Sequence, residues 1–177
     1  MIAVLRLGHR IMRDKRISTH LGLVARAFGA DVIYYSGEKD ESLLASIDSV
    51  SKRWGGGFRT EYRKNWREVI REWPGQVCHL TMYGLPVDDC AKELRECKDL
   101  LVVVGGAKVP GDLYEAADFN VSVSTQPHSE VSALSILLDR VFEGKELKKD
   151  FGGDIQVIPC KNGKNVKMKE GVGEVYE

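Results

Sequence analysis

The chain has 177 residues, of which 43% are hydrophobic and 29% are charged. This length and composition predict one soluble globular domain with a full hydrophobic core. No apolar run is long enough to cross a membrane and no signal peptide opens the chain, so we expect a cytoplasmic protein. The four cysteines lack metal-ligand spacing, so we expect reduced thiols and no metal site.

Positive and negative side chains balance at 26 each, but they are sorted along the sequence. Residues 1–30 carry six basic side chains against Asp14 alone. Residues 52–73 carry seven basic against three acidic side chains, together with all three tryptophans, whereas residues 84–118 carry eight acidic against four basic. The basic segments suit a polyanion such as RNA, although solvated helices carry similar charges.

Helical and strand periodicities alternate in the first half of the chain. In chain order we predict a strand at 2–7, a helix at 14–28, a strand at 31–35, a helix at 41–54, a brief strand near 58–60 and a helix at 63–73.

The second half continues the pattern with a strand at 76–82, a helix at 87–98, a strand at 100–104, a short helix at 111–117, a strand at 120–124 and a helix at 129–142. Repeated strand-to-helix connections predict an α/β fold, with a mostly parallel sheet and helices on both faces. Asn162-Gly163 between two short apolar runs predicts a β-hairpin. We therefore divide the chain into a domain at 1–150 and a C-terminal hairpin extension at 151–177.

Three predicted loops follow the carboxyl ends of strands, where open α/β sheets bind ligands: 83–84, 105–110 and 125–131. Gly105 and Gly106 allow the backbone to approach a ligand closely. None of these loops matches a phosphate-binding glycine motif. A neutral or cationic small ligand held by backbone groups therefore fits better than a nucleotide phosphate.

His128, Ser129 and Glu130 have the chemistry of a catalytic triad. Adjacent residues at a strand-to-helix turn cannot converge on one point, so a triad is a poor interpretation. We predict instead that Ser129 caps the following helix, with Glu130 in its first turn.

Four separated motifs resemble the SPOUT superfamily of RNA methyltransferases: THLGLVARAFGAD, HLTMYG, VVVGGAKVP and NVSVSTQPHSEVSALSILLDR. Together with the opening LRLGHR and RDKRISTH, they are most similar to the archaeal tRNA cytidine-56 2′-O-methyltransferase family. The resemblance covers residues 1 to about 169.

This resemblance implies a SPOUT-like methyltransferase domain at 1–150, with a C-terminal trefoil knot. It implies S-adenosyl-L-methionine bound in the knot, a homodimer with the pocket near the subunit interface, and tRNA as substrate. The product would be a ribose-methylated cytidine in the T-loop.

The resemblance assigns the cofactor to three groups of residues, mostly through backbone atoms. These are Leu80 and Thr81; Gly105, Gly106, Ala107, Lys108 and Val109; and Val123, Ser124, Thr125, Gln126, Pro127, His128, Ser129 and Glu130. Ala107 departs from the family, which often has an acidic residue there.

An arginine of the wider superfamily helps to position and deprotonate the ribose, but its position is occupied here by Leu23. We expect Arg16 to take this role, with Arg10, Arg13 and Arg16 contacting RNA and Asp14 orienting a neighbouring arginine. Asn120 is a second catalytic candidate. Surface arginines that only hold phosphates are the alternative, favoured for Arg10 and Arg13.

Three other functions are compatible with the sequence. These are a SPOUT enzyme acting on another RNA or on a base, an inactive RNA-binding relative, and a nicotinamide-dependent oxidoreductase. The last lacks the glycine fingerprint that it requires. The tryptophans suit RNA stacking or, for Trp66 and Trp73, core packing.

Overall fold

The computed structural model describes residues 1–106 and 108–169. Its strands are β1 (Ile2–His9), β2 (Val32–Gly37), β3 (Arg59–Tyr62), β4 (Gln76–Pro86), β5 (Leu100–Val104), β6 (Phe119–Ser122), β7 (Ile155–Ile158) and β8 (Asn165–Met168). Its α-helices are α1 (Ile11–Ala27), α2 (Glu41–Trp54), α3 (Trp66–Glu72), α4 (Val87–Glu96), α5 (Asp112–Ala116) and α6 (Glu130–Phe142), and η1 (Glu146–Lys148) is a 3₁₀ turn.

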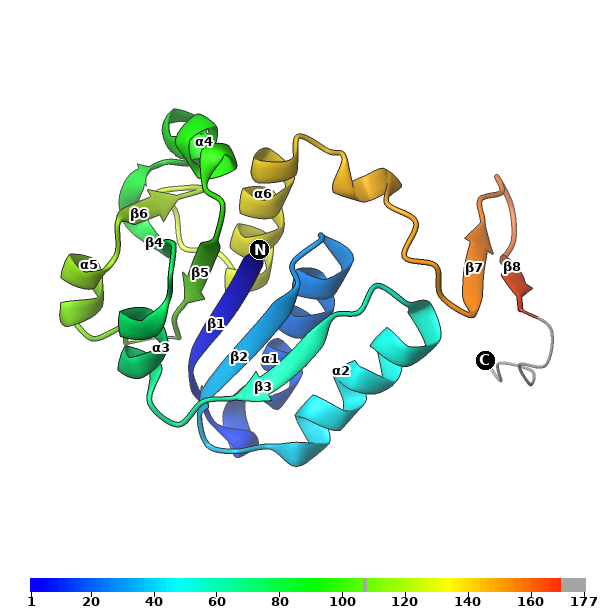
Figure 1. The fold of residues 1–177 in the computed structure, drawn as a ribbon, viewed down its shortest axis with the longest axis horizontal. Coiled ribbons are helices and arrows are strands. Elements are labelled where there is room, and N and C mark those ends of the chain that lie inside the picture. Colours follow the sequence, from blue (N-terminus) through cyan, green and yellow to red (C-terminus); the bar gives the residue numbers. More distant parts are fainter. Residues whose placement is uncertain (107, 170–177) are drawn as a thin grey trace.

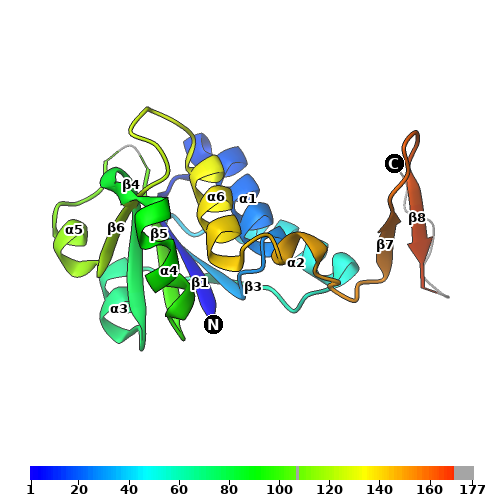
Figure 2. The same ribbon diagram turned by 90° about the horizontal axis from the view of Figure 1, so that it is seen from above.

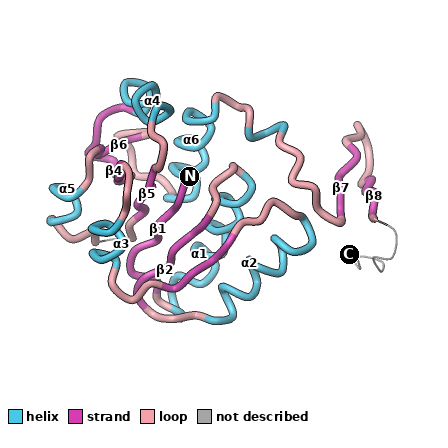
Figure 3. Tube along the Cα trace, viewed as in Figure 1, coloured by secondary structure: helices cyan, strands magenta, loops and turns pink. Residues whose placement is uncertain are grey.

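Six strands form one sheet in the order β3-β2-β1-β5-β4-β6, and every neighbouring pair in it is parallel. Figures 1 and 3 show helices between successive strands of this sheet. The α/β class and the parallel sheet are confirmed. The carboxyl ends of β5, β4 and β6 lie side by side, so the loops that leave them meet at one edge.

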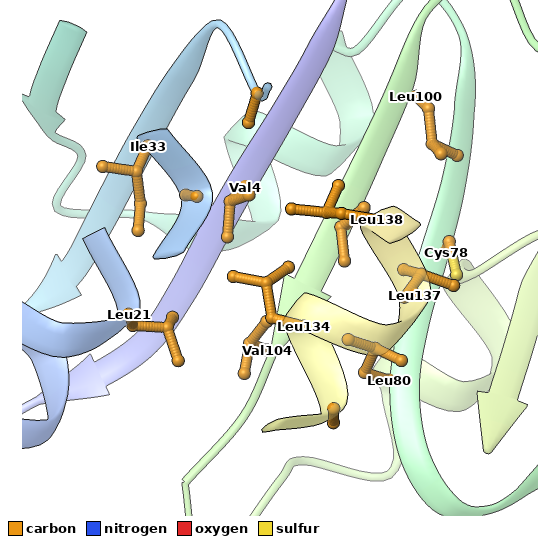
Figure 4. Close-up of a cluster of buried hydrophobic side chains, with 14 of the residues drawn as sticks. Val4, Leu21, Ile33, Cys78, Leu80, Leu100, Val104, Leu134, Leu137 and Leu138 are labelled. Atoms are coloured by element: carbon orange, nitrogen blue, oxygen red, sulfur yellow. The ribbon is translucent and has the colours of Figure 1, made fainter. Parts of the chain in front are cut away.

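Alternate residues of the strands supply two cores, one on each face of the sheet. On one face Val4, Val102 and Val104 pack against α1, α2, α4 and α6. Figure 4 shows Leu134, Leu137 and Leu138 of α6 over this face. On the other face Ala3, Leu5, Leu7, Val32, Leu101 and Val103 pack against α3, α5 and their flanking residues. Helices therefore cover both faces, and Figure 2 shows the layers from above.

Several predicted boundaries were wrong. The helix predicted at 14–28 begins earlier, at Ile11. The predicted helix at 63–73 begins only at Trp66, because β3 extends to Tyr62 to pair with β2 and Asn65 caps the helix by accepting from the Arg67 amide. β4 runs four residues beyond the predicted Met82 and pairs with β6 a second time at Leu85 and Pro86. Trp66 and Trp73 are partly buried against the second core, which agrees with core packing.

The last two described strands, β7 and β8, pair antiparallel with each other and stand apart from the six-stranded sheet (Figures 1 and 2). An isolated bridge between Gly55 and Gly152 ties the segment before β7 to the end of α2. Within the described ranges no helix combines the length and the apolar character of a membrane span.

Candidate active site

A cavity of about 890 Å³ opens where β4, β5 and β6 end. Two different surfaces enclose it. We call the first the backbone wall: the lining residues from β4 and from the loops after β5 and β6, which are Leu80, Thr81, Met82, Tyr83, Gly105, Gly106, Lys108, Val109, Val123, Pro127 and His128. The loop predicted at 83–84 therefore lies inside β4. We call the second the charged wall: Arg6, Arg10, Asp14 and Glu130.

The backbone wall depends on two glycines without side chains. A Cβ at Gly105 would collide with the side chain of Val109, and a Cβ at Gly84 would collide with the backbone of Asn120 and Val121. Glycine at these places lets β4 lie directly against β6 and lets the loop after β5 fold back on itself. Gly105 and Gly106 line the cavity without a side chain, which allows a ligand to approach their peptide groups closely.

A polar network supports the backbone wall, and two of its members, His79 and Tyr114, line the cavity themselves. Asn120 donates its amide nitrogen to the Tyr114 carbonyl at 2.9 Å, so its side-chain oxygen accepts from His79 Nδ1 at 2.8 Å. The Tyr114 hydroxyl lies 3.1 Å from Thr81 Oγ1. His79 is fully buried, and this burial lowers its pKa, so the ring is neutral near pH 7. The network fixes the end of β4 against β6 and α5.

The charged wall is built by β1, α1 and the start of α6. Arg10 forms a two-pronged ion pair with Asp14, with Nε–Oδ2 at 2.8 Å and Nη2–Oδ1 at 3.1 Å. This arginine holds the pKa of the Asp14 carboxyl below its usual value. Arg6 is buried in β1, and its Nη2 lies 3.2 Å from Glu130 Oε1. Both arginines are thus anchored by carboxylates beside the cavity.

The first turn of α6 agrees with the local prediction and adds a contact that it missed. Ser129 Oγ accepts from the Val131 amide at 3.2 Å, which is the predicted N-cap. Glu130 lies in the first turn of α6 and also forms an ion pair with Arg6, which lines the same cavity. His128 donates from Nδ1 to the Gln126 carbonyl at 2.6 Å, so the three polar residues do not form a triad.

A second hollow, which we call the basic groove, continues from the cavity over the ends of β5, β1 and β2. It has a volume of about 500 Å³ and shares Arg10, Gly106 and Lys108 with the cavity. Its further lining is Leu7, Gly8, Arg13, Ser36, Gly37, Lys64, Trp66 and Pro110. Four cations and no carboxylate side chain line it among the described residues, so an anionic polymer backbone fits its charge.

Most residues assigned to the cofactor by resemblance lie together at the cavity. Leu80, Thr81, Gly105, Gly106, Lys108, Val109, Val123, Pro127, His128 and Glu130 line it. Four further residues of the loop after β6 are not among the described residues that line the cavity: Ser124, Thr125, Gln126 and Ser129. Ala107 lies outside the described residues.

The predicted catalytic residues are placed differently. Arg16 is exposed on α1 and is absent from the described lining of both hollows. Asn120 contacts the cavity residues His79 and Tyr114 but is not itself among the described lining residues. Arg10 lies in both hollows and Arg13 in the basic groove. Sequence reasoning missed Arg6, whose only local signal was a charged residue within an apolar strand. No group of three or more potential metal ligands occurs in residues 1–106 and 108–169.

Comparison with known proteins identifies relatives of the chain. The family model described as tRNA ribose 2′-O-methyltransferase, aTrm56, matches residues 54–167. The chain belongs to this family. It is 52% identical over 179 residues to the tRNA (cytidine(56)-2′-O)-methyltransferase of Pyrococcus horikoshii, which covers 98% of this chain and 88% of the relative. The corresponding enzyme of Methanothrix thermoacetophila is 54% identical over 168 residues, with 93% and 96% covered.

Solved structures support the fold of this tRNA ribose 2′-O-methyltransferase family member. The A. aeolicus TrmH/SpoU tRNA modifying enzyme superposes with a TM-score of 0.59 at 16% identity, covering 86% of this chain and 78% of that one. The SpoU methyltransferase AviRb from Streptomyces viridochromogenes, solved with AdoMet, gives a TM-score of 0.56 at 12% identity, covering 82% and 57%. The SPOUT-type resemblance of the sequence is confirmed.

Proposed function

We propose that this chain transfers a methyl group from S-adenosyl-L-methionine to the ribose 2′-oxygen of cytidine 56 in the T-loop of tRNA, with release of one proton. One observation carries the proposal beyond family membership: the cavity and the basic groove meet at Arg10, Gly106 and Lys108. A small-molecule site is therefore continuous with a surface suited to an RNA backbone.

The lining of the cavity suits the chemistry of the cofactor. The glycine-supported backbone wall offers peptide groups to an adenine and an amino acid moiety, and His79 Nε2 is a buried nitrogen without a partner among the described residues. We propose that Leu80, Thr81, the loop 105–109 and the loop 123–130 hold the cofactor. When bound, it supplies a methyl group already activated by its sulfonium.

Little remains for the protein beyond alignment and proton removal, because the leaving group is already activated. The charged wall meets the first need, since its arginines are held rigidly by carboxylates. Arg10, oriented by Asp14 as expected, is positioned to contact the RNA at the junction of the two hollows. Arg13 and Arg16 remain proposed RNA contacts.

Arg16 and Asn120 remain the catalytic proposals made from the sequence. Exposed Arg16 would have to reach a pocket at a subunit interface, and Asn120 would act by orienting the wall through His79. An Arg16→Ala variant with full turnover would remove the Arg16 assignment.

We further propose a homodimer, a trefoil knot and a cytoplasmic location. Tyr83 and Leu85, which are 79% and 65% exposed, support an interface beside the cavity. The knot is proposed from the resemblance to the SPOUT superfamily. The hairpin extension at 151–177 remains a proposed separate unit.

These structural proposals have direct tests. Sedimentation velocity should give a dimer mass at micromolar concentration, and a monomer would contradict the dimer. An experimental structure in which the segment after β6 does not thread a loop would exclude the knot. Immunolabelling of cell sections would test the location.

The function is tested with labelled S-adenosyl-L-methionine and an unmodified tRNA transcript. Nuclease digestion should place the label on the ribose of cytidine 56. Label on a base or on another nucleotide would identify a different SPOUT activity. Cofactor binding without transfer would indicate an inactive RNA-binding relative.

A further inference from the structure

Arg6 occupies an unusual place for a cation. It lies in the central strand β1, in register with Tyr35 of β2 and Val104 of β5, and is only 1% exposed. Its neighbours in the strand are Leu5 and Leu7, both core residues. A buried charge is destabilising unless it is paired and its donors are satisfied. Folding alone therefore gives no reason for an arginine here.

The guanidinium is paired on only one side. Nη2 faces Glu130 Oε1 at 3.2 Å, but Nε and Nη1 are buried and have no hydrogen-bond partner among the described residues. An arginine offers five donors in a planar fork, and unsatisfied buried donors are disfavoured. Acceptor atoms of a ligand would complete this set.

The guanidinium lies beneath the loop after β5. Nη1 and Nη2 are 3.5 and 3.6 Å from where a Cβ of Gly106 would stand, and Gly106 lines both the cavity and the basic groove. The incompletely paired fork is therefore at the junction where a bound cofactor and an RNA strand would meet.

We propose that Arg6, held in place by Glu130, is the residue that grips the acceptor nucleotide, donating to the ribose 2′-oxygen and to the adjoining 3′-phosphate. This inference rests on the proposed function and specifies the acceptor side of the same site. The fork suits two neighbouring oxygens, one of them anionic. A guanidinium is also a poor neighbour for a cationic sulfonium, which favours the acceptor over the methyl donor as its ligand.

Glu130 has a defined part in this arrangement. It begins α6 directly after the cofactor loop and reaches the same guanidinium. It therefore fixes the angle of the fork relative to the backbone wall. Glu130 acts through Arg6 and is a positioning residue.

The decisive variant is Arg6→Lys, which retains the charge and replaces the fork with a single ammonium. We expect kcat to fall by about 100-fold or more, as for removal of one preorganised donor. Binding of S-adenosyl-L-homocysteine, measured by isothermal titration calorimetry, should stay within about twofold. The same titrations include wild type and Arg16→Ala.

Arg26→Lys is the matched control. Arg26 is also buried, at 8% exposure, but lies outside the described lining of the cavity and donates to the Gly55 carbonyl at 2.8 Å. This variant should lose some thermal stability and keep kcat. If circular dichroism shows Arg6→Lys to be unfolded, Glu130→Gln decides, with an expected loss in kcat of about tenfold at saturating S-adenosyl-L-methionine.

Each contrary outcome has a distinct meaning. Full kcat in folded Arg6→Lys, or in Glu130→Gln where that variant decides, overturns the proposal. More than tenfold weaker cofactor binding would make Arg6 a cofactor ligand and also overturns it. A wild-type chain that binds cofactor but transfers no methyl to tRNA overturns the proposed function, and the Arg6 proposal with it.

Discussion

The two walls of the cavity solve the problem of binding in opposite ways. The backbone wall uses peptide groups exposed by glycines and stiffened by a neutral network around His79 and Asn120. The charged wall uses side chains, each arginine anchored by a carboxylate. Peptide groups fix a ligand by shape, and anchored charges act on a neighbouring anion. From this difference we propose that the backbone wall mainly recognises the cofactor and that the charged wall mainly contacts RNA.

The backbone wall should be intolerant of added volume, which gives the largest expected effect. Gly84→Ala places a methyl group within the backbone of Asn120 and Val121, which cannot move without separating β4 from β6. We expect the free energy of unfolding to fall by about 3 kcal/mol or more. Urea denaturation measures the change.

Gly111→Ala is the control for this substitution, because nothing lies within 4 Å of its added Cβ and its φ of −61° suits any residue. Its effect should stay below about 1 kcal/mol. Equal losses in the two variants would show that the β4–β6 contact is not tightly constrained.

Gly106→Ala tests the place where the walls meet. The added methyl stands at an ordinary contact distance of 3.5 Å from Arg6, so stability should change by less than about 0.5 kcal/mol. The methyl occupies space in front of the guanidinium, and turnover should fall by about tenfold or more. Single-turnover methylation assays measure this. An unchanged rate would mean that the reacting groups do not approach this junction.

Binding of tRNA to the basic groove should depend on the salt concentration, whereas binding of the cofactor to the backbone wall should not. Lys64→Ala removes one cation from the basic groove. We expect weaker tRNA binding and a salt dependence of log Kd reduced by about one charge, with unchanged affinity for S-adenosyl-L-homocysteine. Lys92 is an exposed residue of α4, and Lys92→Ala should change neither the affinity for tRNA nor its salt dependence. Filter binding at several salt concentrations measures the slope, and identical slopes for both variants would argue against the groove.

The smallest expected effects are changes in the free energy of unfolding with pH. Residues of the two walls should cause these changes in different pH ranges. Burial lowers the pKa of His79, so the unfolded chain takes up this proton first. The free energy of unfolding should decrease as the pH falls below the ordinary value of 6.5, until the folded pKa is reached. Asp14, whose pKa is lowered mainly by Arg10, should cause a further decrease only below its ordinary value of 3.8.

Two substitutions separate these windows. His79→Gln should remove the first decrease and Asp14→Asn the second, as followed by urea denaturation across pH. Added salt should weaken the effect of Asp14, which depends on an ion pair, more than that of buried His79. If the free energy of unfolding fell in a single pH range, and both substitutions changed that fall equally, the two walls would not contribute to stability independently.

Local sequence signals were sufficient for the loop after β5 and for the cap of α6, but they ended β4 too early, at Met82. Gly105 and Gly106 after a buried strand, Ser129 before an apolar helix and the order of strands and helices all act over a few residues. Their consequences for loops and caps follow from backbone sterics and hydrogen bonding. The three loops were expected at one edge of the sheet because parallel strands end together.

The charged wall was predicted less completely. Arg10 and Asp14 are one helical turn apart, so their pairing is a local signal. Arg16 lies in the same basic segment, but it is exposed and is not among the described residues that line the cavity. Sequence spacing alone did not distinguish Arg16 from Arg10.

The sequence by itself determined the alternation of elements, the glycine loops and the family of this protein. Only the tertiary structure decided that Arg6, in an apolar strand, faces Glu130 at the start of the last helix of the domain. The physical reason is the range of the interactions: turns and caps form between near neighbours, but a buried charge is stabilised by whatever the whole fold brings beside it. The direction of the Arg6 side chain depended on strand register and on the packing of α6, which no local pattern encodes.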